Sequence, residues 1–212
     1  MMIPRDLPSE LDLPLASGEE WWYFVTGRPS VDFVNTLRER WRRRVETLVT
    51  DDDLSRWLIQ ADVLNEPASV DSAVLTSAHN LREAIDRAFQ RVIGDERPSG
   101  ASLKEINDWL PHAAGVPELR QRDAKLRLDE QPRGSAAEQG LGLVALDAAQ
   151  ILSEPATRQR LRICASDTCS ARFFDASPAG RRQWCSMRTC GNVAKARRFR
   201  ERRARHSQGG VG

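Results

Sequence analysis

The chain has 212 residues, of which 40% are hydrophobic and 29% charged, and a formal net charge of +2 at pH 7, a composition typical of globular proteins. No stretch approaches the roughly 18 uninterrupted apolar residues that a membrane span requires, and residues 1–15 lack the basic start and apolar run of a secretory signal. We therefore expect a cytoplasmic protein, in which thiols stay reduced and structural disulfides are rare.

The first segment with a structural signal is residues 24–36. Gly27 and Pro29 predict a turn, and the short apolar run after Pro29 is compatible with either a strand or a helix. Three polar residues lie within this segment. They are candidates for binding a small-molecule effector, and the alternative is that they are hydrogen-bonded structural groups: Arg28, Asp32 and Asn35.

Most of the N-terminal part is predicted to be helical. Thr50, followed by three aspartates, can cap a helix start because short polar side chains accept hydrogen bonds from the first backbone N–H groups. Apolar residues then recur at helical spacing, and Gly94 ends the longest of the predicted helices. Alternation predicts a strand or hairpin arm at 119–128. The predicted fold class is mainly α, with a few strands, and the helices that follow the capped one span 70–93, 103–110 and 141–152.

The composition changes near residues 154–162, and we place a domain boundary there. Residues 1–155 are expected to form the helical domain, residues 156–206 a small cysteine-containing domain, and the glycine-rich residues 207–212 a disordered tail. Charge changes at the same place. Arg158–His206 contains 14 Lys and Arg and three acidic residues, a net charge of +11, so the remainder of the chain carries −9. Such asymmetry suggests an attached nucleic-acid-binding segment, and a solvated charged tail is the alternative.

All four cysteines lie in this basic segment, at Cys164, Cys169, Cys185 and Cys190. Two C-x4-C pairs separated by fifteen residues are what a tetrahedral zinc site with four thiolate ligands needs. Four cysteines close the ligand shell, so the zinc is expected to be structural rather than catalytic. The rival interpretations are disulfides, free buried cysteines and an iron–sulfur cluster.

The surrounding residues predict a zinc-ribbon-like hairpin followed by a helix. Residues 161–164 and 170–175 can form short strands, residues 177–180 a turn, and residues 192–205 the helix. At 100° per residue, Val193, Ala196 and Ala204 cluster on one face, with Phe199 at its edge, and this face is expected to pack on the zinc module. The expected core of the small domain is Ile163, Phe173, Phe174, Trp184 and Phe199.

The opposite face of this helix is basic. Lys195, Arg198, Arg202 and Arg205 fall within an arc of about 80°. Arginines neutralise phosphates and a helix fits the major groove, so we expect DNA to be the partner. A solvated helix, or one that pairs with the acidic domain and inhibits binding, is the alternative. The candidate DNA-binding residues are Asn192, Lys195, Arg197, Arg198, Arg202 and Arg205.

At Cys190-Gly-Asn-Val193 the chain resembles the CGNR zinc-finger proteins, in which the fourth zinc cysteine begins a Cys-Gly-Asn-Arg motif that leads into a basic helix. Residues 27–36, with 53–58, resemble the ABATE domain that precedes this finger. The resemblance implies a stress-induced transcription regulator of bacteria. One residue departs from the motif, because Val193 stands where the family has arginine. If the family's arginine touches a phosphate, this protein has lost one contact, for which Lys195 and Arg197 are candidates to compensate; if it packs structurally, Val193 joins the apolar face of the helix.

The leading hypothesis is a zinc-dependent, DNA-binding transcriptional regulator whose N-terminal domain senses a small molecule or mediates assembly, for instance as a homodimer. The second is an adaptor in which the finger binds protein or RNA. The sequence argues against an enzyme. None of its three histidines pairs with an apparent nucleophile, no cysteine is spare, and no glycine-rich phosphate loop is present.

Overall fold

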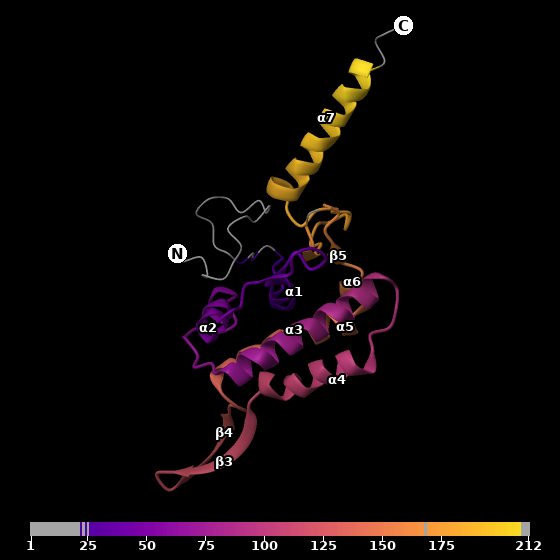
Figure 1. The fold of residues 1–212 in the computed structure, drawn as a ribbon. Helices are drawn as coiled ribbons and strands as arrows, with labels where there is room; N and C mark the ends of the chain where they lie inside the picture. Colours follow the sequence, from indigo (N-terminus) through magenta and orange to yellow (C-terminus); the bar gives the residue numbers. More distant parts are fainter. Residues whose placement is uncertain (1–21, 23, 25, 168, 209–212) are drawn as a thin grey trace.

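The helical core is built from α3 (Ser72–Ile93), α4 (Gly100–Trp109) and α5 (Ala136–Ser153), which pack against one another in Figure 1. This structure is a computed structural model, and it describes residues 22, 24, 26–167 and 169–208. The short helix α1 (Pro29–Val34) packs on α3 and α5 and buries all its apolar side chains apart from the proline. The apolar segment after Pro29, for which strand and helix were both open, is therefore a helix, begun by proline at its first position.

The predicted helix starts and ends are confirmed where a capping residue defines them. Helix α2 (Asp51–Gln60) begins with a capping box, in which the Thr50 hydroxyl accepts from the Asp53 backbone N–H and the Asp53 carboxylate accepts from the Thr50 N–H. Helix α3 ends at the C-cap Gly94. It begins at Ser72, because the Asp71 side chain accepts from the Val74 N–H at its first turn.

Helix α5 is apolar on most of its surface and occupies the centre of the helical domain. The 3-10 helix η1 (Leu110–Ala113) runs close beside it at Gly142. A Cβ atom at Gly142 would lie 2.6 Å from the Ala113 backbone nitrogen, so this approach requires glycine despite its cost inside a helix.

Residues 116–131 form an antiparallel hairpin that extends away from the helices in Figure 1. Strand β3 (Val116–Arg122) and strand β4 (Lys125–Gln131) are joined by Asp123 and Ala124, both with positive φ. The alternating segment 119–128 therefore contains parts of both arms of one hairpin. A second, minimal pair of strands, β1 (Leu37–Arg38) and β2 (Val45–Glu46), lies between α1 and α2 in the chain.

The cysteine-containing part begins after the short helix α6 (Pro155–Arg158). Strand β5 (Leu161–Ile163) pairs antiparallel with β6 (Arg172–Phe174), as the sequence predicts. A π-helical turn, Met187–Gly191, leads into α7 (Asn192–Gln208). Ser207 and Gln208 belong to this helix, so the prediction of a disordered tail from residue 207 is wrong at its start, and residues 209–212 lie outside the described part.

The prediction that Val193, Ala196 and Phe199 pack on the zinc module is wrong. Helix α7 projects away from the rest of the molecule (Figure 1), and Val193 and Phe199 are 50% and 53% exposed. The side chain of Ala204 lies outside the described residues. The buried cluster of the small domain consists of the four cysteines and Phe173, with Ala171 and Trp184 packed against it. Phe174 packs on the main core instead, and Phe199 joins neither cluster.

The predicted fold class, mainly α with a few short strands, is confirmed. None of the helices in the described part of the chain combines the length and the apolar character that crossing a bilayer requires.

Candidate metal centre and basic helix

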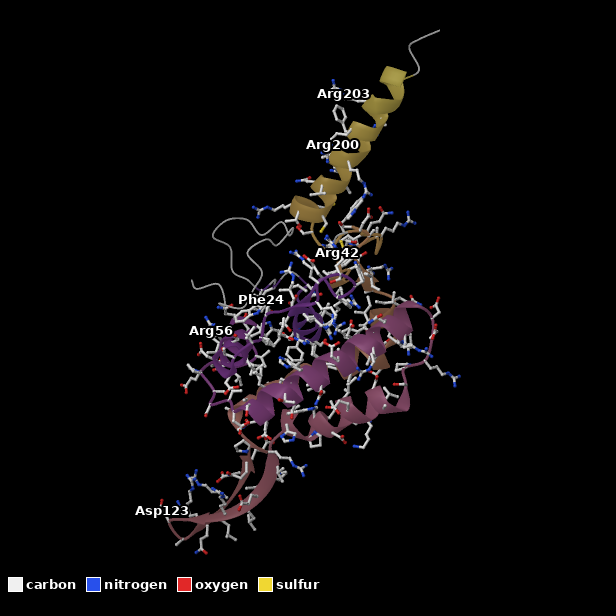
Figure 2. The ribbon with its side chains drawn as sticks, viewed as in Figure 1. Phe24, Arg42, Arg56, Asp123, Arg200 and Arg203 are labelled. Atoms are coloured by element: carbon white, nitrogen blue, oxygen red, sulfur yellow. The ribbon has the colours of Figure 1, made fainter. Side chains whose placement is uncertain are left out.

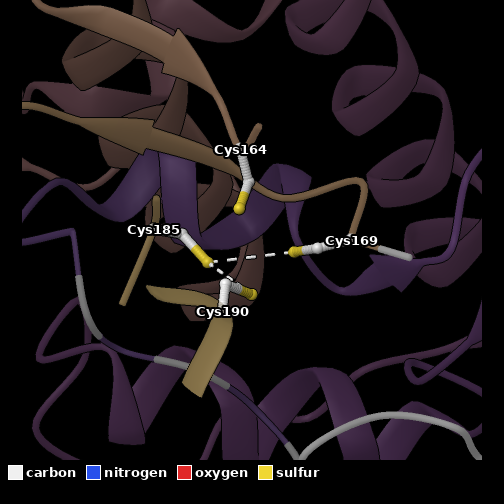
Figure 3. Close-up of side chains that lie close together, drawn as sticks. All are labelled: Cys164, Cys169, Cys185 and Cys190. Carbon is white, nitrogen blue, oxygen red and sulfur yellow. Dashed lines mark hydrogen bonds between the residues drawn. The ribbon is translucent and has the colours of Figure 1, made fainter. Parts of the chain in front are cut away.

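The four cysteine sulfurs converge on one point between β5, β6 and the start of α7 (Figure 3). All lie within 4.8 Å of one another, with 3.8 Å between the Sγ atoms of Cys169 and Cys185 and 3.7 Å between those of Cys185 and Cys190. Four sulfurs about 2.3 Å from a central zinc ion would lie about 3.8 Å apart. A disulfide requires about 2.05 Å. The spacing therefore fits a tetrahedral zinc site and excludes disulfides between these pairs.

Backbone hydrogen bonds fix each pair of ligands in a tight chain reversal. The Cys169 N–H donates to the Ser166 carbonyl at 3.0 Å, and the Cys164 N–H donates across the hairpin to the Ala171 carbonyl at 2.9 Å. In the second pair, the Gly191 N–H donates to the Ser186 carbonyl at 2.9 Å. The Ala165 N–H donates to the Gln183 carbonyl at 2.8 Å and holds the two reversals together.

The clustered thiols need a cation in order to ionise together. Hydrogen bonds from the other three thiols, Cys169 first, lower the pKa of Cys164, whereas hydrogen bonding to Cys164 and the other cysteines raises the pKa of Cys185. The pKa of Cys190 is also lowered and that of Cys169 is raised, so two thiolates are favoured at the expense of the other two. Zinc binding supplies the missing positive charge and releases the remaining protons. The four cysteines hold one structural zinc, with no position left for water.

Two side-chain contacts tie the beginning of α7 to the zinc module. Asn192 Nδ2 donates to the Arg188 carbonyl at 3.1 Å, within the second cysteine pair. Arg197 forms an ion pair with Asp167, which lies within the first pair. These two predicted DNA-binding residues therefore orient the helix. Lys195 and Arg202 are exposed, and the side chains of Arg198 and Arg205 lie outside the described residues.

A second site, missed in the sequence, joins the small domain to the helical domain. The side chain of Asn35 pairs with the backbone of Arg172 on β6: its Oδ1 accepts from the Arg172 N–H at 2.9 Å, and its Nδ2 donates to the Arg172 carbonyl at 2.8 Å. The Arg40 N–H donates to Ser170 Oγ at 2.9 Å. Both contacts fall within three residues of the zinc ligand Cys169.

A buried ion-pair network lies beneath these contacts. Arg172 Nε lies 2.7 Å from Asp86 Oδ1 on α3, and their side chains are only 2% and 4% exposed. Arg40 approaches the same carboxylate at 3.1 Å and also pairs with Glu83 at 2.7 Å. Burial lowers the pKa of Arg172, and the negative charge of Asp86 opposes this shift. One sequence signal marks this network, because Asp86 lies within the buried stripe of α3 beside Ile85 and Phe89.

The residues predicted to bind an effector all have protein partners. Arg28 pairs with Asp147 on α5 at 2.9 Å and lies over the ring of Phe174. Asp32 is buried and accepts a hydrogen bond from the Thr26 N–H, and Asn35 clamps β6. These contacts fit the alternative of hydrogen-bonded structural groups.

The ion pair between Glu46 and Arg82 makes the free energy of unfolding depend on pH. Burial would raise the pKa of Glu46, but the hydrogen bonds and charge of Arg82, at 2.6 Å, outweigh it and lower this pKa. A depressed carboxyl pKa contributes stability above its unfolded value and loses it as pH falls through the folded value. We expect the free energy of unfolding to fall below about pH 4.5. Glu46→Gln should flatten this fall in urea titrations, and an unchanged pH profile would contradict this assignment.

Comparison with known families is consistent with this arrangement. Residues 27–155 match the ABATE family model, described as a putative stress-induced transcription regulator, and residues 160–203 match the CGNR zinc-finger model. Neither is an enzyme family. No curated protein matches the chain.

Proposed function

Because this chain belongs to the ABATE family and carries a CGNR zinc finger, we propose that it is a zinc-dependent transcriptional regulator that binds DNA through α7. The observation that supports this proposal is the projecting basic helix. Seven basic residues and one acidic residue lie between positions 193 and 205. Figure 2 places Arg200 and Arg203 on the far part of α7, away from the helical domain.

The charge pattern of α7 favours a polyanionic partner. Lys195, Arg198 and Arg202 follow one another at spacings of three and four residues, where like charges weaken an isolated helix. The described side chains of this helix are exposed except that of Ala194, so tertiary packing contributes little to its stability. Phosphate groups would remove the repulsion. A helix of 17 residues is about 25 Å long, enough to lie along a major groove.

The salt dependence of binding to duplex DNA tests the proposed surface. Affinity should fall steeply as salt rises, with a log–log slope of about −0.9 for each phosphate contact. We expect the pair of changes Lys195→Ala and Arg202→Ala to weaken binding and to make the slope shallower by about 0.9 for each phosphate that is no longer neutralised. Fluorescence anisotropy of a labelled duplex measures both quantities.

We call the basic face formed by Lys195, Arg198, Arg202 and Arg205 the stripe. The matched control is the pair Arg200→Ala and Arg203→Ala, which removes the same charge from the same helix but outside the stripe. Arg203 lies over the ring of Phe199, 5.8 Å from its centroid. This control should reduce the slope less than the stripe pair. Equal effects would contradict a defined DNA-facing stripe. A flat salt response of the unchanged protein, or preference for an acidic protein, would favour the adaptor.

We further propose that the N-terminal domain regulates this binding in response to a small molecule or stress. The support is the family description together with the contacts that join this domain to the finger. A thermal-shift screen tests it, because a ligand that binds only the folded state raises the melting temperature. We propose in addition that the protein is cytoplasmic and that DNA is its partner in the cell.

A further inference from the structure

The β3–β4 hairpin presents an apolar face that nothing in the described chain covers. Leu119, Leu126 and Leu128 lie on one face and are 65%, 69% and 72% exposed, although the register places Leu119 directly opposite Leu128. The other face carries the charged residues of both strands except Glu130, which shares the leucine face. A two-stranded ribbon is marginally stable in water, and clustered exposed leucines mark an interaction surface.

The charged face is arranged unfavourably within one hairpin. Glu118 lies opposite Asp129, and Arg120 lies opposite Arg127. Like charges directly opposite each other destabilise a strand pair. The ion pair found on this face of the hairpin, between Arg120 and Glu118 at 2.9 Å, runs along β3 and does not involve β4. Opposite charges placed beside β4 would therefore stabilise the hairpin.

The two edges of the hairpin differ in their ability to pair with another strand. The two-residue loop makes Arg122 and Lys125 a hydrogen-bonded pair, and such pairs alternate along the ladder. The backbone groups of Leu126, Leu128 and Glu130 consequently face away from β3. On the opposite edge, an outward position is occupied by Pro117, which has no N–H to donate. Strand β4 is the open edge.

We propose that β4 pairs antiparallel with β4 of a second copy of this chain, about a two-fold axis through Leu128. In this register Arg127 lies opposite the partner's Asp129, and Asp129 lies opposite the partner's Arg127. Leu128 lies beside the partner's Leu128, with both backbone groups of each available for hydrogen bonding. The product is a four-stranded sheet in which Leu119 and Leu128 of both hairpins form one row across the sheet, while Leu126 lies opposite the partner's Glu130.

A second copy is the occupant that this edge fits. The charges on β4 change sign about Leu128, with arginine before it and aspartate after it. An identical strand running in the opposite direction presents the complementary order, which is the self-complementarity that a two-fold interface requires. The proposal does not rest on DNA binding, because it concerns a different element and is tested without DNA.

Charge reversals on β4 have opposite effects on the contacts within one hairpin and on the contacts between two copies, so they distinguish the two. Arg127→Asp would place an aspartate opposite Arg120 within the hairpin, which is favourable, but also opposite the partner's Asp129, which is not. Asp129→Arg acts in the same way toward Glu118 and the partner's Arg127. Each single variant should therefore keep the hairpin folded and weaken the dimer, on the order of tenfold to a hundredfold. The double variant should restore the dimer.

Sedimentation equilibrium of the full-length, zinc-loaded protein measures these dissociation constants. The matched control is Arg122→Asp, which makes the same charge change on the same face but on β3, away from the axis; it should leave the dimer unchanged. Leu128→Asp should weaken it. A monomeric wild-type protein would overturn the proposal. The proposal would also be overturned if Leu128→Asp weakened the dimer while both charge reversals left it unchanged. In that case the two hairpins would pack through their leucine faces and not through the edges of β4.

Discussion

Replacing Cys185 by serine is expected to unfold the small domain and to abolish DNA binding. The buried cluster of this domain contains Phe173, the four cysteines and little else, so it is too small to fold without the metal. Structural zinc supplies about 10–16 kcal/mol in comparable fingers, which exceeds what this cluster can supply by burial. Without zinc nothing holds the two C-x4-C segments together, and the N-terminal end of α7 is no longer fixed in position.

The destabilisation should extend into the helical domain. Ser170 and Arg172 make the contacts to Arg40, Asn35 and Asp86, and they follow Cys169 closely in the chain. Zinc content by elemental analysis, DNA binding by anisotropy and thermal unfolding should therefore all change in Cys185→Ser. Ser186→Ala, at the neighbouring residue, is the control and should keep the metal. A Cys185→Ser protein that retains stoichiometric zinc and full DNA affinity would contradict the assignment.

The second large effect is expected at the buried ion pair between Arg172 and Asp86. Removing one member of a buried pair leaves an uncompensated charge and costs about 3–5 kcal/mol. Asp86→Ala should cost more than Arg172→Ala, because Asp86 also pairs with Arg40 at 3.1 Å. After Arg172→Ala, Asp86 still has Arg40, whereas Asp86→Ala removes a carboxylate from both arginines. Denaturant unfolding of the zinc-loaded variants measures the difference.

The exposed pair between Arg197 and Asp167 provides the comparison. Its side chains are 51% and 67% exposed, and exposed ion pairs contribute about 0–1 kcal/mol. Asp167→Ala should therefore change the free energy of unfolding far less than either buried substitution. If Arg172→Ala were no more destabilising than Asp167→Ala, the two domains would not be joined through this pair.

The features that the sequence predicts well depend on residues close together in the chain. Thr50 caps its helix through Asp53, three residues away, and each zinc reversal lies within a C-x4-C pair. The contact between the domains has no such signal, since Arg172 and Asp86 are 86 residues apart. Periodicity locates Asp86 on the buried face of α3 but does not identify which residue neutralises it.

For helix α7 the sequence predicted a contact that the described part of the structure does not contain. A helical projection gathers Val193, Ala196 and Ala204 on one face, with Phe199 at its edge, and such a face is expected to be buried. The face itself consists of one valine and two alanines, which offer little area to bury, and α7 extends into solvent with Phe199 53% exposed. The exposed position of Val193 means that the arginine found there in the family would also reach solvent, where a phosphate is accessible to it.

The most direct test of α7 as a zinc-held surface that recognises DNA is a selection from random sequences. The purified, zinc-loaded chain is incubated with a pool of random duplex DNA, and the bound fraction is sequenced over successive rounds. We predict that one sequence motif becomes enriched, and that enrichment disappears with Cys185→Ser. Recovery of sequences without a common motif by the zinc-loaded protein would contradict a sequence-specific regulator and favour an adaptor.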